Sequence, residues 1–96
     1  MNRLVLSAQL VERGALRYTP AGLPALDLSL KHESEVSENG QPRKVSVEIR
    51  ALAIGDIVAT LSALALGSQG QFAGFLASSR NGRFLRFHVT SIDPQV

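Results

Sequence analysis

The chain has 96 residues, 45% of them hydrophobic and 19% charged, so it is long enough for one small domain and too apolar to be disordered. The absence of cysteine excludes a disulfide framework and a thiolate metal site, and it fits a reducing cytoplasm. No apolar run approaches the roughly 18 residues that a membrane helix needs. We therefore expect one domain over residues 1–96 and no membrane partner. The formal charge of +2 permits a polyanionic partner without requiring one.

The first half of the chain predicts three strands. Residues 3–11, 26–31 and 44–50 alternate between apolar and polar side chains, and a period of two is typical of a strand with one buried face. A turn rich in proline and glycine at residues 20–24 separates the first two strands. Asn39-Gly40 is a strong turn signal, so we expect the second and third strands to form a hairpin with a long polar tip.

The period then changes to that of a helix. Gly55 or Asp56 is placed to begin this helix and Gly67 to end it. The apolar residues at helical spacing are Ile54, Ile57, Val58, Leu61 and Leu64.

The last third of the chain returns to a period of two. Residues 72–77 and 84–89 alternate, and Asn81-Gly82 predicts a tight turn between them. The order is therefore three strands, one helix and two strands. We expect an all-β fold: a five-stranded OB-fold barrel with one short helix between strands three and four.

No catalytic centre is indicated by the sequence. His32 and His88 lie far apart along the chain, no serine sits in a nucleophile elbow, and no glycine-rich loop joins a strand to a helix. We therefore expect no enzyme activity, no cofactor and no metal site.

The last hairpin carries the strongest binding signal. Arg80 and Arg83 flank its turn, while Phe84, Arg86 and His88 share one strand face. Cations that follow a phosphate backbone and planar groups that stack on bases are what single-stranded nucleic acid requires. The alternative interpretation is a solvated turn, with Phe84 in the core or in a dimer contact.

A second basic region lies on the hairpin between the second and third strands. In OB-folds, oligonucleotides cross these two strands between the loops that join strands one to two and four to five. We therefore expect the two hairpins to converge on one groove, with Arg17 and Tyr18 at its rim. The alternative is the ordinary polar outer face of a barrel. The cations concerned are Lys31, Arg43, Lys44 and Arg50.

The stretches NRLVLSAQL and LRYTPAGLPALDLSL resemble the N-terminal half of bacterial single-strand DNA-binding proteins. The R-Y-T-x-x-G turn of that family is matched by Arg17, Tyr18, Thr19 and Gly22. Three further features resemble, more narrowly, a primosomal branch of the family. They are the opening NRLVLS, the pair Lys31-His32, and the stretch GSQGQFAGFLAS that leads into NG and FHVTSI. Because Tyr18 belongs to the family's turn pattern, we expect its ring to cover the barrel mouth rather than to stack on a base.

The resemblance implies a homodimeric OB-fold in the bacterial cytoplasm that binds single-stranded DNA without sequence preference. It also implies partners in replication restart, namely the restart helicase and the proteins that load the replicative helicase. Some relatives carry stacking aromatics on the hairpin between the second and third strands, where this chain has Gln41 and Ser46. DNA binding must then depend on cations. Among these cations, the DNA-binding role that the resemblance implies is clearest for Arg43.

The leading hypothesis is an accessory protein of replication restart that binds single-stranded DNA and the restart helicase. The alternative is a protein-interaction adaptor whose OB groove has little affinity for DNA. The acidic residues Glu33, Glu35 and Glu38 are interpreted as a solvated loop. The candidate DNA-binding residues are Arg17, Lys31, Arg43, Lys44, Arg80, Arg83, Phe84 and Arg86.

Overall fold

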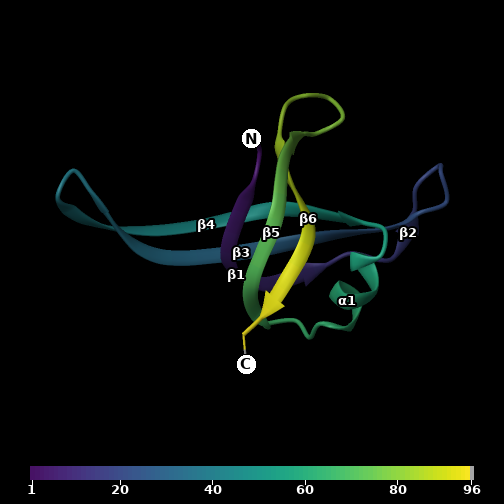
Figure 1. The fold of residues 1–96 in the computed structure, drawn as a ribbon, viewed down its shortest axis with the longest axis horizontal. Helices are drawn as coiled ribbons and strands as arrows, with labels where there is room; N and C mark the ends of the chain where they lie inside the picture. Colours follow the sequence, from purple (N-terminus) through teal and green to yellow (C-terminus); the bar gives the residue numbers. More distant parts are fainter. Residues whose placement is uncertain (96) are drawn as a thin grey trace.

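The strands close into a barrel (Figure 1). Most alternating segments bury their apolar face inside it, whereas in residues 44–50 Val47 is exposed and Val45 and Ile49 are only partly buried. The computed structural model describes residues 1–95. Its elements are β1 (Leu4–Arg13), β2 (Arg17–Tyr18), β3 (Pro24–Glu38), β4 (Gln41–Ile54), α1 (Ile57–Ala63), β5 (Gln69–Ser78) and β6 (Leu85–Pro94).

The strands are hydrogen-bonded in the order β1-β5-β6-β4-β3-β2, and a further pairing of β1 with β3 closes the barrel. Within residues 1–95, β4 and β6 are the only paired strands that run parallel to each other. Five strands form the barrel, as predicted, while β2 is a two-residue strand paired to the start of β3. Because β2 adds one strand to the count, the helix lies between β4 and β5 in this numbering. The OB-fold prediction is confirmed.

The core is made of inward-facing leucines and two phenylalanines, and α1 covers one end of it. Phe72 on β5 and Phe87 on β6 are completely buried, and Val58 and Leu61 of α1 pack into the same cluster. The helix ends at Ala63, before the predicted stop at Gly67. Carbonyl groups at the end of the helix accept hydrogen bonds from the Arg13 guanidinium, which donates to the carbonyl oxygens of Leu61 and Leu64.

The hairpin of β3 and β4 extends beyond the barrel as a paired arm (Figure 1). The predicted long polar tip is wrong, because the ladder continues to the pair Glu38 and Gln41. Only Asn39 and Gly40 form the turn, with φ angles of 51° and 74°, and two positive φ angles are the mark of a two-residue hairpin turn. Among the described residues, no helix is long and apolar enough to cross a membrane.

The ladder between β5 and β6 contains a bulge where the register shifts between Ala73 and Gly74. Gly74 allows the two backbones to approach closely, since a Cβ atom there would overlap the carbonyl oxygen of His88. This bulge sets which residues of β5 and β6 face each other on the outer surface of the barrel.

Gly74→Ala is expected to lower the free energy of unfolding by about 1–3 kcal/mol or more, because backbone must move to admit the new atom. Urea denaturation followed by circular dichroism measures the change. Gly14→Ala is the matched control, since its Cβ would lie an ordinary 3.6 Å from Asp27. Equal stability of the two variants would contradict the close approach at Gly74.

Candidate nucleic-acid interface

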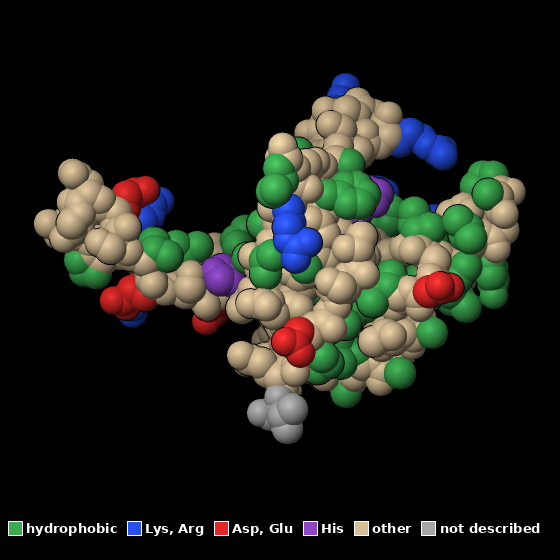
Figure 2. Space-filling model, in the orientation of Figure 1, with side chains coloured by type: hydrophobic (Ala, Val, Ile, Leu, Met, Phe, Trp, Pro, Cys, Tyr) green, Lys and Arg blue, Asp and Glu red, His purple; other side chains and the backbone are tan. Residues whose placement is uncertain are grey.

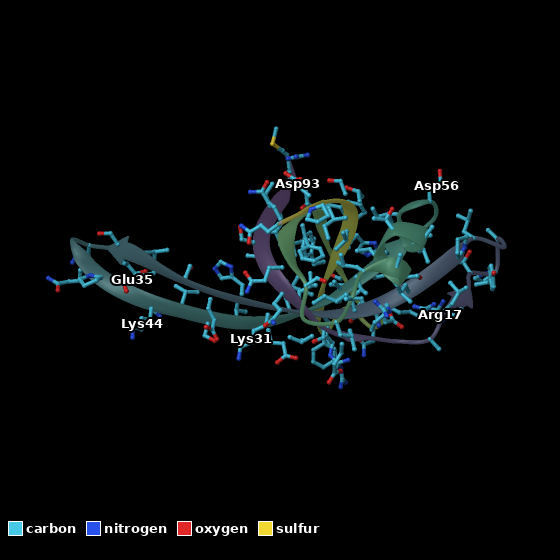
Figure 3. All side chains as sticks on the ribbon, turned by 90° about the horizontal axis from the view of Figure 1, so that it is seen from below. Arg17, Lys31, Glu35, Lys44, Asp56 and Asp93 are labelled. Carbon is cyan, nitrogen blue, oxygen red and sulfur yellow. The ribbon has the colours of Figure 1, made fainter. Side chains whose placement is uncertain are left out.

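The candidate DNA-binding residues do not gather in one groove. Arg17 lies on β2 at one end of the molecule, whereas Lys44 lies on the arm toward the opposite end (Figure 3). The loop between β5 and β6 projects in a third direction (Figure 1). The expected convergence of the two hairpins is therefore wrong, because the β3–β4 ladder continues outward instead of folding over the barrel.

Three of the candidate cations are held by carboxylates of the same surface. The Arg17 guanidinium donates two hydrogen bonds of 3.2 Å to Asp27.

The Lys31 ammonium lies 3.4 Å from Glu33, and the Arg43 guanidinium donates to Glu38 at 2.7 Å. Exposed pairs of this kind contribute about 0–1 kcal/mol each, so a phosphate can displace the carboxylate. The local charge that attracts the phosphate is nevertheless reduced.

The outer face of β3 and β4 is balanced in charge as a whole. The Ser29 hydroxyl donates to Glu48 at 2.8 Å, and Lys44 stands opposite Glu35 in the ladder. A groove of about 530 Å³ on this face is lined by charges of both signs. This is the face that oligonucleotides cross in other OB-folds, and here it offers no excess of cations. The charged residues that line the groove are Glu12, Arg13, Asp27, Glu48 and Arg50.

The loop between β5 and β6 has a different electrostatic character. Residues 57–92 contain no aspartate or glutamate. Within the described part of the chain, Arg80, Arg83 and Arg86 take part in no ion pair. Figure 2 shows basic side chains at the tip of this loop without acidic neighbours on the visible face. The loop is therefore the most strongly cationic of the candidate regions.

The loop is shaped by its own side chains. The Asn81 side-chain oxygen accepts hydrogen bonds from the Ser79 hydroxyl at 2.7 Å and from the Arg83 amide at 3.0 Å. The Ser79 amide in turn donates to the Phe84 carbonyl at 2.6 Å. Phe84 is 66% exposed, which excludes the alternative that placed it in the core.

Tyr18 does not cover the barrel mouth, so the expectation of that role is wrong. The residue is 65% exposed, and it sits on β2 opposite Pro24 of β3. The end of the barrel is covered by α1 instead. Leu16 and Leu23, on either side of β2 in the sequence, are also exposed, and with Tyr18 these three exposed residues are called the apolar rim.

A stacked aromatic pair on the outer surface was not singled out by the sequence analysis. The rings of Phe75 on β5 and His88 on β6 stack, with centroids 4.7 Å apart and planes inclined by 11°. The two residues are direct partners in the β5–β6 ladder. The available signal was a phenylalanine on the outward side of an alternating strand, but only the register could place His88 against it.

The family profile described as "Another single-strand binding protein family" matches residues 2–91. The replication restart protein PriB of Bordetella pertussis is 55% identical over 80 residues, which cover 83% of this chain and 75% of the relative. The PriB of Nitrosomonas europaea is 32% identical and covers 92% of this chain and 82% of its own.

The chain belongs to the PriB family of single-strand binding proteins.

Solved structures agree with this family assignment. PriB of Ralstonia solanacearum superposes with a TM-score of 0.91 at 36% identity, over 100% of this chain and 99% of that one. The single-stranded DNA binding protein of Thermus aquaticus gives a TM-score of 0.78 at 27% identity, over 100% of this chain and 50% of that one. The resemblance to a primosomal branch of the single-strand binding proteins is thereby confirmed.

The surroundings of His88 predict how stability changes with pH. Burial and then the positive charge of Arg86 lower the pKa of His88 below its usual 6.5. The unfolded chain therefore binds a proton at higher pH than the folded chain, and stability is lost as the pH falls through the unfolded value. The melting temperature should fall more for the parent than for His88→Gln between about pH 7.5 and about pH 5.5. Thermal melts followed by circular dichroism measure the melting temperature. If it falls equally with pH in the parent and in His88→Gln, the lowered pKa of His88 is contradicted.

Proposed function

We propose that this protein binds single-stranded DNA as an accessory protein of bacterial replication restart, in the cytoplasm and without catalytic activity. The observation that carries the proposal is the cluster of Arg80, Arg83 and Arg86 in a segment free of acidic residues, on the fold of a PriB family member. Phosphates are the ligands that such a cluster attracts. Further contacts are assigned to Arg17, Lys31, Arg43, Lys44 and Phe84.

Binding is proposed to depend on charge more than on stacking along the arm. Gln41 and Ser46 are exposed and cannot stack on a base, so the arm supplies cations without a planar surface. Contacts to phosphate carry no sequence information. The protein should therefore bind single strands of any sequence with a strong dependence on salt.

Replacing Arg80 and Arg83 together by alanine is expected to weaken binding of a thymidine oligonucleotide. Each single-strand phosphate contact contributes about 0.7 to the slope of log affinity against log salt. Three or four contacts in the parent give a slope of roughly −2 to −3, and the double variant should flatten it by about one unit. Fluorescence anisotropy titrations at several salt concentrations measure both quantities.

The control for this experiment changes charge in the opposite direction. Replacing Glu35 and Glu38 by glutamine removes two negative charges, including that of the carboxylate paired with Arg43, so it should leave binding unchanged or strengthen it slightly. If the double arginine variant binds like the parent with the same slope, the β5–β6 loop is not the DNA site. The cluster would then be assigned to a protein partner.

A second candidate function is that of a protein-interaction adaptor with little affinity for DNA. The charge-balanced outer face of β3 and β4 favours it, as does the apolar rim of Leu16, Tyr18 and Leu23. The proposed protein partners are the restart helicase and the proteins that load the replicative helicase. A filter-binding titration at low and moderate salt separates the two functions, because only the DNA-binding protein retains the oligonucleotide.

We also propose that the protein is a homodimer. β1 pairs with β5 over residues 4–9 but with β3 only from Gln9 onward. Within the described residues this leaves one edge of the first half of β1 without a strand partner. Unpaired edges favour association with a second strand, and small domains gain stability from added burial.

Light scattering at micromolar concentration is expected to give about twice the chain mass of 10.3 kDa. The reason is the unpaired edge of β1, which a second copy can extend in antiparallel register. A mass of one chain throughout that concentration range would rule out the dimer.

A further inference from the structure

The stacked pair of Phe75 and His88 lies outside the core. On the same two strands, Phe72 and Phe87 face inward and are completely buried, whereas Phe75 is 38% exposed on the outward side. A stack of two rings has two outer faces, and this exposure leaves room for another planar group. The inner phenylalanines already supply the packing of β5 and β6, so the outer pair is not needed to fill the barrel.

Two arginines lie near this pair, and one of them, Arg50, also lines the charge-balanced groove with Asp27 and Glu48. The parallel register aligns Leu52 of β4 with His88 of β6. Two residues earlier on each strand, alternation places Arg50 and Arg86 on the same outward face. Arg86 also stands opposite Ala77, which is too small to cover it. Cations therefore lie beside the ring pair on the two neighbouring strands.

The pair is also continuous with the cationic loop. The loop residues Arg83 and Phe84 lead directly into β6, which carries Arg86 and His88. Side chains at successive outward positions on one strand lie about 7 Å apart. Neighbouring nucleotides of an extended, flexible single strand can adopt a similar spacing. No acidic residue occurs between Ile57 and Ile92 to interrupt this path.

We propose that Phe75 and His88 form a base-stacking platform, flanked by Arg86 and Arg50, on the outer face of β5, β6 and β4. This inference rests on the proposed function and names the surface that the single strand follows. The strand enters at the β5–β6 loop, stacks a base on the ring pair, and places the adjoining phosphates against the two arginines. The platform supplies the planar surface that the arm lacks at Gln41 and Ser46.

The test separates contacts to bases from contacts to phosphates. Two probes of equal length are used, a thymidine oligonucleotide and the same backbone carrying abasic sites. Phe75→Leu removes the ring and retains apolar bulk, and Phe75→Tyr is the matched control that retains the ring. Both are titrated by fluorescence anisotropy at one salt concentration, after circular dichroism has shown that they are folded.

The parent is expected to prefer the thymidine probe over the abasic probe. Phe75→Leu should lower affinity for the thymidine probe by about fivefold or more and leave affinity for the abasic probe unchanged. Phe75→Tyr should keep the preference of the parent. If Phe75→Leu does not fold, His88→Leu removes the other ring and gives the same readout.

Three results would overturn the inference, and they are distinguishable. If the parent binds neither probe, the proposed function fails and the platform with it. If the parent binds and Phe75→Leu keeps the parent's preference for thymidine, only the platform fails. If Phe75→Leu keeps that preference but changes the mass measured by light scattering, the ring pair belongs to a contact between copies of the chain.

Discussion

Closure of the barrel depends on one strand that pairs with two others. β1 runs beside β5 over its first half and beside β3 over its second half, and its register against β3 shifts between Leu10 and Glu12. This double pairing turns the sheet on itself, so that Leu10 becomes completely buried. It also carries Arg13 to the end of α1, where its guanidinium satisfies the last carbonyl groups of the helix. The core, the helix and the outer faces follow from this closure.

The same closure divides the cations into two groups. On β2 and the arm, strand pairing brings carboxylates beside Arg17 and Arg43, and on β3 alternation places Glu33 beside Lys31, so the charges of these three cations are partly compensated. The β5–β6 loop lies in a part of the chain without acidic residues, so no carboxylate of that segment reduces the positive potential of its arginines. Under the proposed function, a ligand with many negative charges would be steered to the loop first, and the arm would contribute only after its ion pairs open.

Aromatic groups follow a similar division. The arm presents Gln41 and Ser46, which have no ring, while β5 and β6 present Phe75 and His88 side by side. Charge and planar surface thus coincide on the outer face of β5 and β6. The bulge at Gly74 fixes this coincidence, because it sets the register that brings the two rings together.

The sequence by itself determined the order of the five barrel strands and the helix, the turn at Asn39-Gly40, and membership of the fold class, because period and turn chemistry are local properties. The predicted tight turn at Asn81-Gly82 is wrong, because residues 79–84 form a longer loop between β5 and β6. Only the tertiary structure decided that Arg17 pairs with Asp27 and Arg43 with Glu38, since an ion pair across strands depends on register. Tertiary packing likewise exposed Tyr18, extended the arm beyond its predicted length, and stacked Phe75 on His88. Each of these features joins residues distant in sequence or depends on which surface another element covers, and alternation along one strand carries no information about either.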